Sequence, residues 1–222
     1  MYKVFLSPSN QYDNVYAYGN TTEGVQCGKI ADACKIALER SGVDVMLMHD
    51  EDMQTKCAES NKFDADLHVP IHTNAFNGSV MGTRMFCYNT GKGMAACKAI
   101  FARVAPLSPG TSENIQVNQK LYEVRVPAAP TAYIECEFHD TVEGSKWIVE
   151  NTVLIGETIA RGICDYFGVT FKEPEQPKPA EPATTDTLYR VQVGAFAVRE
   201  NAEKMLARLK AAGFDGFIRE GK

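Results

Sequence analysis

Three residues of types that serve in hydrolytic sites stand where expected strands end or an expected helix begins. His72 follows the apolar segment ADLHVPI, Glu135 lies in the strand-like segment TAYIECEF, and Glu23 opens the first long helical segment. A histidine and two carboxylates can bind a metal ion or transfer protons in general acid–base catalysis. These three positions are therefore the first candidates for chemistry.

Each of these residues also has a purely structural interpretation. Glu23 could simply complement the positive end of the helix dipole, and His72 could be a buried histidine with satisfied ring nitrogens. Glu135 is harder to explain by structure alone, because it is flanked by Ile134 and Phe138. A carboxylate in an apolar strand is costly to bury unless it has a partner or a task.

The elements around these residues alternate between strands and helices. Strands are expected at residues 2–7, 43–48, 65–71, 83–88 and 131–138, and helices at 23–41, 91–104 and 145–167. Strands separated by helices predict an α/β layered fold with a mostly parallel sheet flanked by helices. In such sheets, sites form at the carboxyl ends of the strands, where the candidate residues stand.

The composition changes after residue 171. Residues 172–187 are rich in Pro, Glu, Lys and Thr and have almost no large apolar side chains, so we expect an extended linker. It separates a domain at residues 1–171 from a small β-α-β tail at residues 188–222. In the tail we expect Asn201 to cap a helix whose apolar stripe includes Met205, Leu206 and Leu209.

The bulk composition excludes several classes of partner. The chain has 222 residues and a formal net charge of −5, so we expect no nucleic-acid partner. No apolar run approaches the roughly 20 residues that span a bilayer, and we expect no membrane association. Seven cysteines without a CxxC pair argue against a disulfide framework and against a cysteine zinc site. We expect most of them to be small core residues.

Four segments together resemble the zinc-dependent N-acetylmuramoyl-L-alanine amidases, in particular their phage-type branch. Residues 69–78, VPIHTNAFNG, resemble the zinc-binding IHxNA motif, and residues 130–140, PTAYIECEFHD, resemble the strand of the catalytic glutamate. Residues 18–33 resemble the segment that supplies a glutamate ligand, and residues 147–169 are similar to the closing helix of the phage-type members. The resemblance spans residues 1–170, with the motifs in the family's order.

The resemblance implies a mononuclear zinc site with His72 and Glu23 as ligands and Glu135 as the general base. The reaction would be hydrolysis of the amide bond between N-acetylmuramic acid and L-alanine of peptidoglycan by a zinc-activated water. Zinc polarises the carbonyl and lowers the pKa of bound water to about 7. His139 and Asn74, which lie beside the two motifs, are expected to contact the substrate.

One feature departs from the family pattern. The family has a histidine near the end of the first strand, whereas residues 7–14 here read SPSNQYDN. We expect Asp13 to be the third ligand, because a carboxylate oxygen is an acceptable zinc ligand. Asn10 is the alternative from strict alignment, and both Asn10 and Gln11 would be weak, neutral ligands. His68, four residues before His72, would lie about 13 Å further along the strand, so we interpret it as a packed or outer-shell histidine.

The tail resembles the start of a SPOR domain, whose motif is matched by YRVQVGAF and the following residues to 213. The resemblance implies binding to the glycan strands of peptidoglycan. A unit of about 35 residues is marginal alone, so we expect two copies of residues 188–222 to pair in a homodimer.

Two functional hypotheses stay open from the sequence. One is an active zinc amidase, and the other is a catalytically impaired wall-binding protein on an amidase scaffold, motivated by the missing first-strand histidine. The amino terminus lacks a secretory signal, so we expect synthesis in the cytoplasm and action on the wall after release, as for an endolysin or another lysis enzyme. Secretion is the alternative if the sequence has been trimmed.

Overall fold

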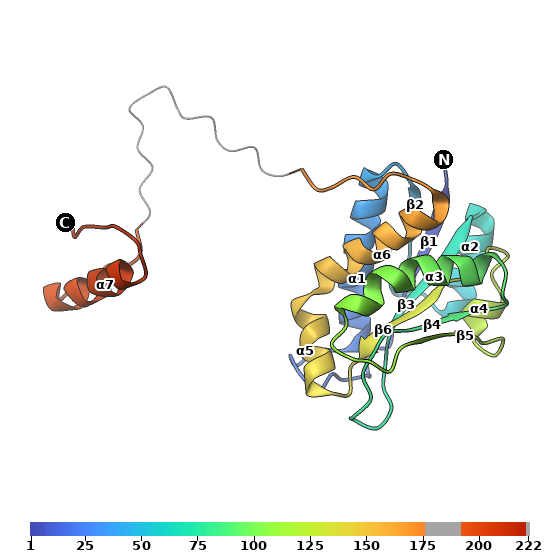
Figure 1. Ribbon diagram of the computed structural model, residues 1–222, viewed down its shortest axis with the longest axis horizontal. Coiled ribbons are helices and arrows are strands. Elements are labelled where there is room, and N and C mark those ends of the chain that lie inside the picture. The colour runs from blue at the N-terminus through green and yellow to red at the C-terminus, as the bar shows by residue number, and fades with distance from the viewer. Residues whose placement is uncertain (176–191, 221–222) are drawn as a thin grey trace. The chain divides into compact units, whose positions relative to one another are not determined.

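The computed structural model of the protein describes residues 1–175 and 192–220. The chain divides into two compact units, Met1–Pro174 and Glu175–Lys222 (Figure 1). The expected linker therefore lies mostly outside the described residues, as do residues 188–191 of the tail. The first unit contains all the residues singled out for chemistry.

A six-stranded sheet forms the centre of the first unit, with strand order β2-β1-β3-β6-β4-β5. The strands are β1 (Lys3–Pro8), β2 (Asp44–Leu47), β3 (Leu67–Asn74), β4 (Arg84–Cys87), β5 (Asn114–Val117) and β6 (Tyr133–Phe138). The first four in spatial order are parallel, whereas β4 is antiparallel to β6 and parallel to β5. The predicted α/β fold with a mostly parallel sheet is confirmed.

The main core lies between the sheet and three helices, α1 (Glu23–Arg40), α3 (Lys92–Val104) and α6 (Thr152–Phe167). Figure 1 shows these helices side by side, with α6 next to both α1 and α3. Side chains alternate along a strand, and Leu67, Val69 and Ile71 of β3 are the ones that enter this core.

The opposite face of the sheet is covered by two shorter helices, α2 (Met53–Phe63) and α4 (Tyr122–Arg125). Because alternate residues of β3 point to opposite faces, His68 and His72 point to this second face. Ser60 of α2 contacts His68, and Glu123 of α4 lies near both histidines. The candidate site is therefore on the face away from the main core.

Several elements differ from the sequence-based expectation. The single helix expected at residues 145–167 is two helices, α5 (Val142–Glu150) and α6, separated at Asn151. Asn151 has φ −127° and ψ 19°, and its side-chain amide donates to the Trp147 carbonyl at 2.8 Å. This local hydrogen bond competes with the helical backbone pattern. The helices α2 and α4 and the strand β5 were not expected.

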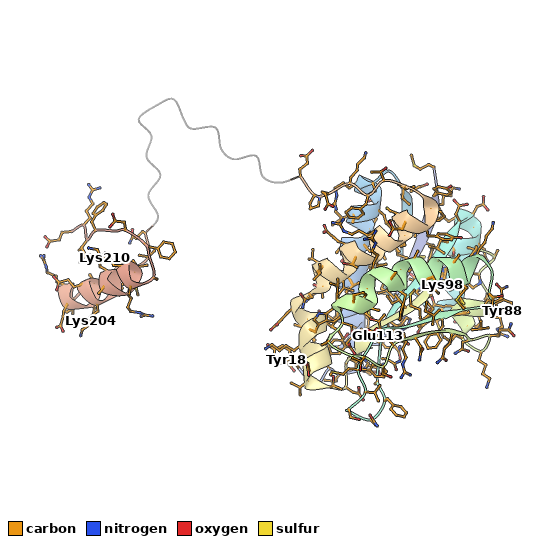
Figure 2. All side chains as sticks on the ribbon, viewed as in Figure 1. Tyr18, Tyr88, Lys98, Glu113, Lys204 and Lys210 are labelled. Atoms are coloured by element: carbon orange, nitrogen blue, oxygen red, sulfur yellow. The ribbon has the colours of Figure 1, made fainter. Side chains whose placement is uncertain are left out.

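The second unit contains one helix within the described residues, α7 (Arg199–Ala211). The expected flanking strands are absent from residues 192–220. The helix begins after Val198 without a side-chain cap, and Asn201, the expected cap, lies within its first turn. No residue of α7 is buried, and Figure 2 shows its side chains, Lys204 and Lys210 among them, projecting from the helix. Strands need partners to satisfy their backbone groups, and the described tail provides none.

All seven cysteines are free and buried, which confirms their interpretation as core residues. Among the described residues, no helix has both the length and the apolar character required to cross a membrane.

Candidate metal and catalytic site

The site lies at the carboxyl ends of the parallel strands β1, β3 and β6. His72 near the end of β3 is the register partner of Glu135 in β6, so the two side chains leave the sheet on the same face. The register shifts between His72 and Asn74. The Tyr133 ring packs flat against the His72 imidazole, with centroids 4.7 Å apart, which fixes the plane of that imidazole.

The loop between β1 and α1 brings Gln11 to the start of the helix. The Gly24 backbone N–H donates to the Gln11 carbonyl at 3.1 Å, and the Glu23 N–H donates to the Asn14 carbonyl at 2.9 Å. A side chain at position 24 would meet the Tyr12 ring at 2.8 Å, so glycine there permits the close approach. The loop is thereby fixed against the first turn of α1, where Glu23 is buried.

Gln11, Glu23 and His72 form a compact triangle of polar atoms. His72 Nδ1 lies 2.9 Å from Glu23 Oε1, and the Gln11 side-chain amide lies 3.3 Å from Glu23 Oε1 and 3.5 Å from His72 Nδ1. The second carboxylate oxygen of Glu23 accepts from the Asn14 amide at 2.8 Å, which orients Oε1 towards the other two groups.

This triangle has the size that a zinc site requires. Three ligands at about 2.0–2.2 Å from a tetrahedral zinc lie roughly 3.3 Å apart. The oxygen and nitrogen of a glutamine amide exchange places by rotation about one bond, so Gln11 can present its carbonyl oxygen instead of its amide nitrogen. At present that oxygen accepts from the Asn14 amide at 3.1 Å, so the rotation would exchange this hydrogen bond for a metal contact. An imidazole, a carboxylate and a side-chain amide therefore converge in an arrangement that could hold a metal ion.

The protonation states of His72 and Glu23 depend on each other. Burial alone would lower the pKa of His72, but the nearby carboxylates of Glu123 and Glu23, together with the negative charge of Glu135, raise it to about 9. Burial would raise the pKa of Glu23, yet the His72 interaction and the Asn14 amide hold it below its usual range. Without metal, His72 therefore carries a proton at neutral pH that a metal would displace.

Glu135 has the properties of a proton acceptor that operates near neutrality. Burial is the main cause that raises its pKa to about 7, with the Glu23 charge adding to the effect and His72 and Arg84 opposing it. Its Oε2 atom is buried and has no hydrogen-bond partner among the described residues. A carboxylate with an unpaired oxygen in such a site can take a proton from water and pass it on.

The structure does not bring every candidate to this place. Asp13 is exposed and has no hydrogen bond or ion pair within the described part of the chain. The Asn10 side chain turns away and donates to the Glu51 carbonyl at 3.1 Å. Gln11, which the sequence argument set aside as a weak neutral ligand, is the residue of this loop that faces Glu23 and His72.

His139 and Asn74 lie beside the triangle in a hydrogen-bonded group. His139 Nδ1 is 2.9 Å from the Thr73 hydroxyl, which is 2.8 Å from the Tyr16 hydroxyl, and the Tyr16 and His139 rings stack at 4.9 Å. The backbone N–H of His139 donates to the Asn74 backbone carbonyl at 2.7 Å. His139 is 4% exposed, so these contacts hold the loops around the site in place.

Sequence reasoning missed Glu123, a buried carboxylate that lies near His68 and His72. Cys57, His68 and Glu123 form a buried cluster whose potential ligand atoms all lie within 4.8 Å of one another, a second arrangement that could hold a metal. The signal in the sequence was Glu123 itself, a carboxylate between Tyr122 and Val124, the same pattern that marked Glu135.

Comparison with known proteins gives matches to both units. The family model described as N-acetylmuramoyl-L-alanine amidase matches residues 10–165, and the SPOR domain model matches residues 173–220. A sporulation-specific N-acetylmuramoyl-L-alanine amidase from Bacillus subtilis is 24% identical, over 98% of this chain and 84% of its own length.

Solved structures match the fold of the first unit. The catalytic domain of CwlV, an N-acetylmuramoyl-L-alanine amidase from Bacillus (Paenibacillus) polymyxa, has a TM-score of 0.69 at 16% identity, covering 77% of this chain and all of that one. The amidase AmiC2 of Nostoc punctiforme has a TM-score of 0.65 at 19% identity, covering 75% of this chain and 97% of the other.

Proposed function

Because the chain belongs to the N-acetylmuramoyl-L-alanine amidase family, we propose that it cleaves the amide bond between N-acetylmuramic acid and L-alanine with a zinc ion held by Gln11, Glu23 and His72. The amidase and SPOR matches indicate peptidoglycan as the polymer that it binds. The observation that carries the proposal is the triangle of polar groups, with His72 Nδ1 2.9 Å from Glu23 Oε1 and the Gln11 amide nitrogen 3.3 and 3.5 Å from these two atoms.

The residues of the site have separate tasks in this proposal. Zinc, when bound, polarises the substrate carbonyl and lowers the pKa of a bound water. Glu135 accepts the proton of the attacking water through its unpaired oxygen and returns it to the leaving L-alanine amine. Its raised pKa places this exchange near neutral pH. Asn74, partly exposed at the end of β3, is proposed to contact the glycan or the peptide. His139, 4% exposed, is proposed to contribute to the same subsite by holding Asn74 in place.

Glu135→Gln tests the role of the general base. We expect hydrolysis of purified cell walls to fall by about 100-fold or more, while zinc content and the unfolding midpoint stay close to those of the unmodified chain. Glu137→Gln is the matched control, since Glu137 is a buried carboxylate two residues along the same strand that accepts from Gly82 N–H and Phe138 N–H. It should lose stability but keep its activity per folded molecule. If Glu135→Gln keeps activity within a few-fold, Glu135 is not the base.

The competing hypothesis, an impaired wall-binding scaffold, is motivated by the neutral ligand Gln11. An amide oxygen is a weaker ligand than an imidazole for Zn²⁺, so zinc could be lost on dilution. A purified chain that sediments with cell walls, contains no zinc and hydrolyses nothing after zinc is added would favour the scaffold.

We propose that the tail binds the glycan strands and pairs with a second copy. This is supported by the SPOR match and by α7, whose apolar residues Met205, Leu206 and Leu209 stay partly exposed within the described tail.

The proposed place of action is the cell wall, after release from the cytoplasm or secretion. Neither nucleic acid nor membrane is a proposed partner.

A further inference from the structure

A buried carboxylate lies behind His72, on the side away from the triangle. Glu123 in α4 is 3% exposed. The Ser7 hydroxyl at the end of β1 donates to its Oε1 atom. Lys56 of α2 is also buried nearby, and its ammonium donates to the Pro8 carbonyl at 2.7 Å. A charge in such a place is costly unless hydrogen-bond donors surround it.

Two imidazoles face this carboxylate. His68 Nε2 lies 3.5 Å from Glu123 Oε1, and His72 Nε2 lies 3.7 Å from Glu123 Oε2. Both Nε2 atoms are buried and have no hydrogen-bond partner within the described part of the chain. His72 therefore lies between two carboxylates, with Nδ1 towards Glu23 and Nε2 towards Glu123.

We propose that Glu123 is a positioning residue that holds the Nε2 proton of His72 and so presents the Nδ1 lone pair to the metal. This inference rests on the proposed zinc site. A metal-ligating histidine usually donates its other N–H to a carboxylate, a carbonyl or water, which fixes the tautomer and raises the basicity of the ligand. Glu123 is the carboxylate placed to do this for His72.

The groups around Glu123 are suited to that role because they are themselves held by contacts with the sheet and with α2. His68 is fixed by the Ser60 hydroxyl at 3.0 Å from its Nδ1 and by stacking on Phe5 at 5.3 Å between ring centroids. Ser7 donates to Oε1, and His68 lies on the same side, so Oε2 is the oxygen that faces His72. A more basic His72 would offset the weaker donation expected from the neutral amide of Gln11.

Glu123→Gln tests the proposal, because glutamine keeps the shape of the side chain and removes the charge. Zinc affinity, measured by competition with a chromophoric chelator, should fall by about 10- to 100-fold. In the zinc-loaded chain, the NMR resonance of the His72 Nε2 proton should move upfield or broaden through exchange with water. If Glu123→Gln does not fold, Ser7→Ala replaces it as the test. Ser7→Ala removes a single hydrogen-bond donor to Glu123 and should lower the zinc affinity by a few-fold.

Glu137→Gln is the matched control, since it also neutralises a fully buried, hydrogen-bonded glutamate. It should lower stability and leave both the zinc affinity and the resonance of the His72 Nε2 proton unchanged.

Three results would overturn the proposal. The first is a Glu123→Gln chain whose zinc affinity stays within two-fold of the unmodified chain and whose His72 Nε2 proton resonance does not move. Two zinc ions per unmodified chain, one of them lost in Glu123→Gln, also overturns it in favour of a metal bound by Cys57, His68 and Glu123. An unmodified chain that binds no zinc refutes the proposed site itself and this inference with it.

Discussion

At the scale of single residues, the site depends on which atoms of Gln11, Glu23 and His72 face one another. The anionic oxygen of Glu23 and the Nδ1 atom of His72 are held at 2.9 Å by contacts from behind, from Asn14 to Glu23 and from Tyr133 to the His72 ring. Gln11 completes the group from a loop. Glu23 and His72 are therefore held in place, and Gln11 would bind an ion through its oxygen after rotation of its amide.

Replacing the three polar residues of the loop one at a time tests the third ligand. We expect Gln11→Ala to weaken zinc binding on the order of 100-fold, since a direct ligand should matter at least as much as an outer-shell partner. Asn10→Ala and Asp13→Ala should change the zinc affinity by no more than about two-fold, because neither side chain reaches the triangle. Chelator competition measures all three variants. A loss confined to Asp13→Ala would return the third ligand to that carboxylate.

The raised pKa of His72 predicts how zinc affinity depends on pH. Below about pH 9 the metal-free imidazole is protonated, so zinc must displace one proton to bind. The apparent affinity should therefore rise about tenfold per pH unit between pH 6 and 8 and level off near pH 9. Titrations at pH 6, 7 and 8 in the same zinc buffer measure the slope. A flat profile across this range would mean that His72 is not a ligand.

The sequence predicted His72 and Glu135 as candidates because they stand at the end of an apolar strand or within one, and Glu23 because it begins a helix. Their roles were implied by the resemblance to the amidases. A polar residue at a strand end or within an apolar strand stands out against the period of its neighbours. Gln11 does not, because the loop at residues 9–22 has no period to interrupt. Its place follows from the Gly24 N–H to Gln11 carbonyl hydrogen bond, a contact between loop and helix that no local pattern encodes. The place of Glu123 beside the histidines could not be predicted without knowing that α4 covers the face of the sheet that carries them.

At the scale of elements, α1 carries Glu23 and packs against α6, which also packs against α3. Glycines of α6 permit both of these helix contacts, Gly156 that with α1 and Gly162 that with α3. A side chain at Gly156 would meet the Ile30 carbonyl at 2.4 Å, and one at Gly162 would meet Ile100 Cα at 2.5 Å. Neither neighbour is a flexible side-chain end, so the helices themselves would have to separate.

Gly156→Ala should therefore destabilise the chain by about 1–3 kcal/mol, despite the better helix propensity of alanine. Gly28→Ala in α1 is the control, because a side chain there would meet only the His49 ring, at 3.2 Å. It should be neutral or stabilise by up to about 1 kcal/mol. Urea unfolding of the two variants measures the difference, and equal stabilities would show that the α1–α6 contact tolerates separation.

The order of the longer strands and helices could be predicted from the sequence, because the periodic spacing of their apolar residues reflects which face each element buries. The division of residues 145–167 at Asn151 could not, since the apolar stripe continues through both α5 and α6. The short helix α4 was missed for a different reason. Four residues are too few to show a helical period.

At the scale of the whole molecule, a catalytic unit and a tail are joined by residues whose placement the structure does not describe. The tail matches the SPOR model over residues 173–220, yet none of the residues of α7 is buried. A helix with an uncovered apolar stripe is stabilised by packing against another surface. Symmetric pairing is the commonest way to supply one.

Light scattering on the full chain and on a chain that ends at Pro174 tests the pairing. We expect the full chain to be a dimer at tens of micromolar and the shorter chain to be a monomer. The shorter chain keeps Glu173, which pairs with Arg161 at 2.5 Å, so the first unit stays intact. A monomeric full chain would exclude pairing through the tail at that concentration.

The central claim is that this site cleaves the muramoyl–alanine amide, and the chemical ends released from peptidoglycan test it most directly. Purified cell walls digested with the zinc-loaded full chain should yield new amino-terminal L-alanine and no new reducing sugar ends. The same digestion with a chelator present should yield neither. Release of reducing ends, or of amino termini other than L-alanine, would contradict the assignment of the bond, and no release at all from the zinc-loaded chain would contradict catalysis by this site.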